Sequence, residues 1–201
     1  VFYLIILDNK NSDIYYDYLI DMNNISSINI NNIIFNVNDK IEILFDDGLI
    51  RKITDETKYD NMIKVAIFCH NKDGLPKNID EKMICACNIM KDVHKLEELR
   101  MLINYPYIDN RINTYPSTLV YNEFKLFRPL KRELSDNNAD NILIVMSNLF
   151  GLNYKISYSI VEEKQYIEKI TNSLIYEDRK IEKFFKQIEI VLRNYIKKKT
   201  I

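Results

Sequence analysis

The sequence predicts an α+β fold: a mostly antiparallel β-sheet in the first three quarters of the chain, intervening short helices, and two C-terminal amphipathic helices. Two observations predict it. Up to about residue 160, short apolar runs are separated by turn residues, a pattern typical of strands. Beyond that point, apolar residues recur every three or four positions, as in amphipathic helices. Strands followed by helices favour α+β over a doubly wound fold. We therefore expect a β-rich domain over residues 1–160 and a helical hairpin over residues 161–201, packed as one cooperative unit.

The clearest strand signal is a β-hairpin over residues 40–55. Alternating apolar residues from Ile41 to Phe45 precede the turn Asp46-Asp47-Gly48, and the chain returns from Leu49 to Ile53. Gly48 is expected at the turn position that needs a positive φ. Further strands are predicted from apolar runs over residues 1–7, 62–69, 119–127, 141–146 and 154–160.

Helical spacing predicts helices over residues 13–22, 92–103, 166–174 and 178–198. The last is the strongest, because eight apolar residues form one stripe without Gly or Pro, and Lys197 to Lys199 suit the C-terminal end of a helix dipole. Residues 82–90 fit a strand or a helix. The polar, aromatic segment 105–117 is expected to be a surface loop, and residues 135–140 resemble a linker.

Composition excludes several classes of protein. Of 201 residues, 47% are hydrophobic and 28% are charged, as in globular domains, and the net charge of −1 argues against a protein that coats nucleic acid. The chain holds 33 Ile and 24 Asn but only three Gly, three Ala and no Trp. Ile and Asn have AT-rich codons, so the skew indicates an AT-rich genome, such as that of an intracellular parasite.

The three glycines, Gly48, Gly74 and Gly151, lie far apart, so neither a Walker A loop nor a dinucleotide-binding fingerprint can be written on the chain. With only two histidines as well, we expect no cofactor, no small-molecule substrate and no catalysis.

A metal site is the alternative with the clearest residues. Zinc prefers Cys and His ligands, and Cys69, Cys85, Cys87 and His94 lie within a short span. On a strand, Cys85 and Cys87 would point to the same face. The C-x2-C spacing of zinc knuckles is absent, and buried free cysteines are common. We therefore expect reduced, metal-free cysteines, and keep as an alternative a small metal-dependent hydrolase or nuclease; a Cys–His dyad of Cys69 or Cys87 with His94 would draw on the same residues.

The preferred interaction site is a basic and aromatic segment. Lys125, Arg128, Lys131 and Arg132 fall within eight positions and alternate with Phe124, Phe127 and Leu130, and the preceding loop adds Tyr107, Arg111 and Tyr115. Basic residues bind phosphates and aromatic rings stack on bases. The alternative is a strand with one basic face and core aromatic residues. On such a strand, Lys125 and Phe127 would share a face and Pro129 would end the pairing.

These patterns favour a non-catalytic regulatory factor that docks on a large RNA–protein assembly, for which the ribosome and its rRNA are the best example. A structural subunit of a protein complex, docking through the C-terminal helix, is the second alternative. No run reaches the roughly 20 apolar residues of a membrane helix, the apolar start lacks a preceding basic region, and three cysteines cannot all pair. We therefore expect a cytoplasmic protein that does not contact membranes.

Overall fold

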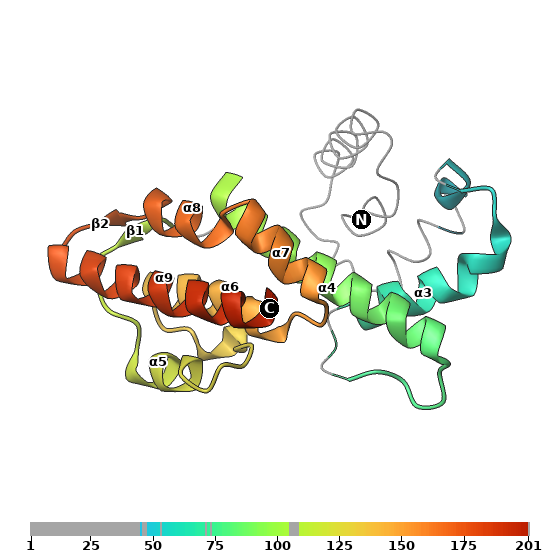
Figure 1. Ribbon diagram of the computed structural model, residues 1–201, viewed down its shortest axis with the longest axis horizontal. Helices are drawn as coiled ribbons and strands as arrows, with labels where there is room; N and C mark the ends of the chain where they lie inside the picture. The colour runs from blue at the N-terminus through green and yellow to red at the C-terminus, as the bar shows by residue number, and fades with distance from the viewer. Residues whose placement is uncertain are drawn as a thin grey trace, which may run out of the picture. The chain divides into compact units, whose positions relative to one another are not determined.

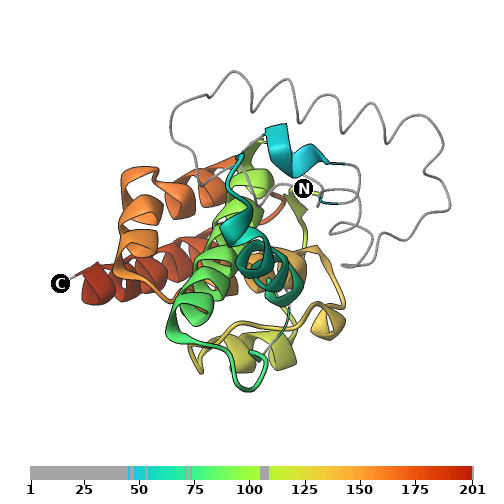
Figure 2. The same ribbon diagram turned by 90° about the vertical axis from the view of Figure 1, so that its right-hand side faces the viewer.

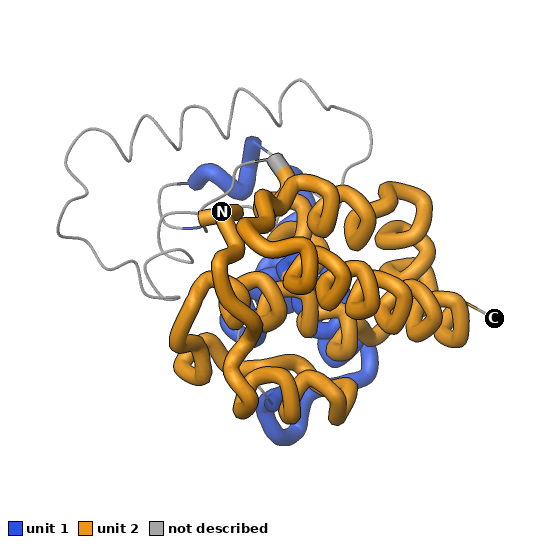
Figure 3. Tube along the Cα trace, turned by 90° about the vertical axis from the view of Figure 1, so that its left-hand side faces the viewer, with its two compact units in different colours: residues 1–94 blue, residues 95–201 orange. Residues whose placement is uncertain are grey.

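The computed structural model describes residues 45, 48–52, 54–70, 72, 74–104 and 109–200, and helices dominate them (Figure 1). The chain divides into two compact units, residues 1–94 and residues 95–201 (Figure 3). The predicted strand over residues 1–7, the predicted helix over residues 13–22 and most of the first arm of the predicted hairpin lie outside the described residues.

The first unit contains two 3-10 turns, η2 (Leu49–Lys52) and η3 (Thr57–Tyr59), then helix α3 (Asp60–Cys69) and the beginning of α4 (Glu81–Asn104). Asp80 starts α4, because its Oδ1 accepts the backbone N–H of Met83 at 2.8 Å. Among the described residues of this unit, one buried apolar cluster consists of Ile50, Ile63, Ala66, Ile67, Cys69, Cys87 and Met90.

The second unit is a helical bundle around α6 (Asn138–Ser147), in which every residue from Ile142 to Ser147 is buried. α9 (Arg179–Thr200) packs along α7 (Lys155–Glu163) and α8 (Tyr166–Ser173), as Figures 1 and 2 both show. The remaining elements of this unit are α5 (Thr118–Phe124), the 3-10 turns η4 (Arg132–Leu134) and η5 (Asn148–Gly151), and the strands β1 (Arg111–Ile112) and β2 (Ile175–Tyr176).

The predicted α+β fold with an antiparallel sheet is wrong. Among the described residues, the only sheet is the two-residue parallel pair of β1 and β2, with Arg111 opposite Ile175 and Ile112 opposite Tyr176. Of the predicted return arm of the hairpin, Leu49 to Ile53, the described residues Leu49–Lys52 form the 3-10 turn η2 instead. The runs predicted as strands over residues 62–69, 119–127, 141–146 and 154–160 fall in α3, α5, α6 and α7. The predicted domain boundary between residues 160 and 161 lies inside α7.

Burial on more than one side explains why α6 was predicted as a strand. A helix packed on several sides is apolar all round and carries no period that distinguishes it from a buried strand. In α6 an N-terminal cap favours a helix over a strand. The side-chain oxygen of Asn137, a residue of the predicted linker, accepts a hydrogen bond from the backbone N–H of Asp140 at 2.9 Å. Ser117 caps α5 in the same way, by accepting the N–H of Val120 at 3.3 Å.

The helices with a clear apolar stripe are confirmed. The segment 92–103 is helical within α4, the C-terminal pair is present as α8 and α9, and α9 runs unbroken across the predicted range 178–198. Its buried residues Ile181, Phe185, Ile188, Leu192 and Ile196 all belong to the predicted stripe.

Candidate nucleic-acid interface

Residues 119–127 form a helix and a turn instead of the predicted strand. The basic residues of this segment therefore do not lie on one face of a strand. α5 ends at Phe124, and the α5–η4 loop, residues 125–131, follows. Lys125 is exposed, and its ammonium lies 4.7 Å from the centre of the Tyr121 ring. Phe127 turns the chain with a φ of 54°, so the strand alternation predicted for Lys125 and Phe127 does not occur.

The two arginines among the four predicted phosphate-binding cations have acidic partners within the chain. Arg128 forms an ion pair with Glu123 of α5, with Nε 3.1 Å from Oε2, and Arg132 pairs with Glu98 of α4. Both guanidinium groups remain more than half exposed. Exposed pairs of this kind contribute at most about 1 kcal/mol, so a phosphate could displace either carboxylate at small cost. Lys125 and Lys131 are exposed as well.

Near its C-terminal end, α9 packs against the α5–η4 loop through Tyr195. The rings of Phe127 and Tyr195 are stacked, with centroids 5.7 Å apart and planes only 7° from parallel. Phe150 meets both rings edge-on, and Lys199 lies 5.5 Å from the centre of the Tyr195 ring. The lysines that end α9 are thereby brought beside the basic residues of the α5–η4 loop.

A second aromatic cluster continues from Lys125. Tyr121 and the predicted residue Tyr115 both meet the ring of Phe184 edge-on, at centroid distances of 5.2 and 5.5 Å. Through Phe184, Tyr115 therefore lies close to Tyr121, the ring that Lys125 covers. We call the basic–aromatic surface the set Tyr115, Tyr121, Lys125, Phe127, Arg128, Lys131, Tyr195 and Lys199.

The remaining predicted residues lie elsewhere or are not described. Arg111 belongs to β1 and pairs with Asp109, whose hydrogen bonds and charge raise the pKa of the guanidinium. Arg132 is exposed and follows Lys131, so it lies at the edge of the basic–aromatic surface, and its guanidinium pairs with Glu98 of α4. Tyr107 lies outside the described residues. Sequence reasoning missed Tyr195 and assigned Phe127 to a strand; the spacing of Tyr195 and Lys199, one helical turn apart, was the available signal.

Contacts with the end of α6 and with η5 anchor the α5–η4 loop. The N–H of Leu130 donates to Ser147 Oγ at 2.9 Å, and this buried hydroxyl donates to the carbonyl of Ile144 at 2.6 Å. Pro129 sits against Gly151, where a Cβ would approach Pro129 Cγ to 2.5 Å. A side chain at Gly151 would therefore push the loop away.

The candidate metal ligands do not form one cluster. Because residues 82–90 are helical, the positions of Cys85 and Cys87 are separated by a rotation of about 200° around the helix axis. The two cysteines therefore lie on different sides of the helix: Cys85 is exposed, and Cys87 is buried beside Cys69. Burial raises the pKa of the Cys87 thiol to about 11, with a further contribution from Cys69, so the thiol stays protonated at neutral pH. His94 lies 5.2 Å from His70, measured between ring centroids. Within the described residues, no three His, Cys, Asp or Glu side chains are placed to hold a metal.

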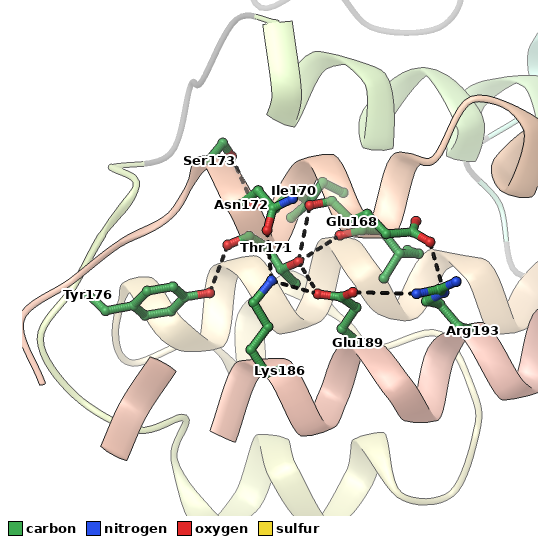
Figure 4. Close-up of polar contacts among 10 residues, drawn as sticks. Glu168, Ile170, Thr171, Asn172, Ser173, Tyr176, Lys186, Glu189 and Arg193 are labelled. Carbon is green, nitrogen blue, oxygen red and sulfur yellow. Dashed lines mark hydrogen bonds and ion pairs between the residues drawn. The ribbon is translucent and has the colours of Figure 1, made fainter. Parts of the chain in front are cut away.

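A polar network between α8 and α9 was not predicted (Figure 4). The buried Thr171 hydroxyl donates to Glu189 Oε2 at 2.6 Å, and Lys186 reaches the same oxygen at 3.0 Å. Arg193 bridges Glu189 and Glu168, with Nε 2.8 Å from Glu168 Oε1. The spacing of Lys186, Glu189 and Arg193 along one helix was a usable signal. Because Thr171 is fully buried and its hydroxyl is engaged, the network joins two helices and offers no nucleophile to a substrate.

This network predicts a dependence of stability on pH. Desolvation alone would raise the pKa of Glu189, but hydrogen bonds from Thr171 and Lys186 and the nearby positive charges outweigh it, and the pKa is lowered from its ordinary value of 4.5. A lowered carboxyl pKa stabilises the fold above the unfolded-state value, and the contribution is lost as pH falls through the folded-state value. We expect Glu189→Gln to lower the free energy of unfolding by about 1–2 kcal/mol at pH 7 and by much less near pH 3, measured by urea denaturation. An equal loss at both pH values would contradict this ionic role.

None of the described helices has the length and apolar character needed to cross a membrane. Comparison of the chain with protein-family models, with curated proteins and with solved structures found no match. The functional argument therefore depends on the geometry of the basic–aromatic surface.

Proposed function

We propose that this chain is a non-catalytic binding factor that docks on a large RNA–protein assembly, with the ribosome as the leading candidate, through the basic–aromatic surface. The observation that carries the proposal is the stacking of Phe127 on Tyr195. It joins the basic segment 125–132 to Lys199 near the end of α9, which lies far away in the sequence, and the exposed ring of Phe127 lies between them. Phosphates are bound by such cations and bases by such rings.

Two further observations support binding over catalysis. Every fully buried side-chain nitrogen or oxygen of the described residues has a hydrogen-bond partner within the chain, so the buried polar groups have structural roles. The surface also lies on helices and on a loop anchored through Ser147 and Gly151, and a rigid support lowers the entropic cost of association. None of the three cysteines forms a disulfide, as a reducing compartment allows, and we propose the cytoplasm as the site of action.

The proposal is tested by co-sedimentation with ribosomes and by binding to RNA at several salt concentrations. The informative variant carries Arg128→Gln, Lys131→Gln and Arg132→Gln. Neutral glutamine is preferred to glutamate, because Glu123 and Glu98 already lie beside the two arginines. We expect the wild-type affinity for RNA to fall steeply as the salt concentration rises. Each cation that neutralises a phosphate of single-stranded RNA contributes roughly 0.7 to the slope of log K against log salt. The loss of three cations should therefore decrease the magnitude of this slope by about 2 in the variant.

The matched control removes the same charge elsewhere, with Lys169→Gln, Lys180→Gln and Lys183→Gln. These exposed lysines lie in α8 and in the first half of α9, away from the end that carries Tyr195 and Lys199. The proposal is contradicted if both triple variants lose affinity equally, or if the first retains wild-type binding. Association that is insensitive to salt would indicate docking on protein.

A further inference from the structure

Phe127 combines two unusual properties. It adopts a φ of 54°, a left-handed conformation that bulky residues rarely occupy, and it keeps 46% of its surface exposed. Burial of the ring therefore does not account for the strained backbone. Strain of this kind persists where the surrounding structure imposes it, and it is concentrated at functional positions. Here the left-handed residue ends α5, because the N–H of Phe127 donates to the carbonyl of Phe124 at 3.0 Å.

The ring of Phe127 is also held in a fixed plane. Tyr195 stacks nearly parallel to it, and Phe150 meets it edge-on at 5.3 Å between centroids. Phe150 and Tyr195 come from η5 and α9, so three separate elements define the position of one exposed ring. An aromatic platform that is ordered before binding loses little entropy when a planar ligand stacks on it.

The positive charges near these rings indicate which kind of planar ligand would bind. Lys199 lies beside Tyr195, Lys125 lies beside Tyr121, and both ammonium groups are on exposed residues. A nucleotide chain presents an aromatic base between two phosphates, and exposed cations beside two neighbouring aromatic rings suit such a ligand. In a duplex the faces of the bases are covered by their neighbours, so only an unpaired base can use the platform.

We infer that Phe127, supported by Tyr195, is a stacking site for an unpaired base of single-stranded RNA, with Lys125 and Lys199 binding the flanking phosphates. This inference rests on the proposed function and specifies it, because docking through phosphates alone would need no ring. It also predicts a preference that the basic residues cannot produce: single-stranded RNA is bound more tightly than duplex RNA of equal charge.

The test uses the full chain and a 12-nucleotide oligouridine that carries one 2-aminopurine, a base whose fluorescence falls on stacking. Wild-type protein is expected to quench the probe and to prefer it to a duplex. Phe127→Ala is expected to weaken binding of the single strand about tenfold, to abolish quenching, and to leave duplex affinity and the salt slope unchanged. Leu126→Ala, which alters the adjacent and still more exposed side chain, is the matched control and is expected to bind like wild type.

Two further variants protect the test against misfolding. Phe127→Leu retains an apolar contact with Phe150 without a ring and is expected to behave as Phe127→Ala, whereas Phe127→Tyr is expected to bind normally. If the leucine variant keeps its melting temperature, wild-type affinity and quenching, the stacking site is refuted. If in addition the Arg128, Lys131 and Arg132 variant still weakens binding, the proposed function survives that refutation. If the wild-type protein binds neither RNA, both proposals fail.

Discussion

Phe185→Ala is expected to lower the free energy of unfolding by about 3–5 kcal/mol, the usual cost of removing a phenyl ring from a packed core. Phe185 is fully buried in α9, and its ring lies 5.8 Å from that of Tyr176 and 5.6 Å from that of Phe184, between centroids. Urea denaturation followed by circular dichroism measures the loss as a lower midpoint with an unchanged m-value.

Ile190→Ala on the same helix is the matched control for this prediction. Ile190 is more than half exposed, so its truncation should change the free energy of unfolding by less than about 0.5 kcal/mol. Equal stability of the Phe185→Ala variant and the wild type would contradict the position of α9 in the bundle.

Asp140→Ala is expected to cost about 3 kcal/mol of stability, although it removes no apolar surface. Asp140 is fully buried, and its carboxylate accepts two backbone N–H groups, from Ser117 at 2.7 Å and from Asp136 at 3.0 Å. Hydrogen bonds to a charged acceptor contribute about 1.5–3 kcal/mol each, and their removal leaves buried donors unsatisfied. The carboxylate thereby joins the start of α5 to the start of α6.

Asp140→Asn separates the contribution of the negative charge from that of the hydrogen bonds, because the asparagine amide is neutral but retains one acceptor oxygen. It should lose less stability than Asp140→Ala, whereas Asp136→Ala at the exposed neighbouring position should change little. Thermal unfolding monitored by circular dichroism compares the three variants. Wild-type stability in Asp140→Ala would show that water replaces the carboxylate.

The candidate interface could be predicted from the sequence only in part. The cluster from Lys125 to Arg132 is visible along the chain. The partners that modify it are distant: Glu98 lies 34 residues before Arg132, and Tyr195 meets Phe127 only because α9 returns along the bundle. Charge pairing and ring stacking across such separations depend on the packing of the helices, which local patterns do not encode.

By itself, the sequence determined the elements whose two sides differ in polarity. The apolar stripe of α9 could be recognised because one face meets the core and the other meets water, so the period of 3.6 residues is visible in the sequence. The same apolar spacing marks the helical segment from residue 92 to residue 103. Only the tertiary structure decided the identity of α6, where Ile142 to Met146 are buried on all sides and any conformation would satisfy the same apolar run. There the cap of Asn137 and the packing of α5, rather than periodicity, select a helix. The same packing turned a predicted basic strand into a loop that stacks on α9.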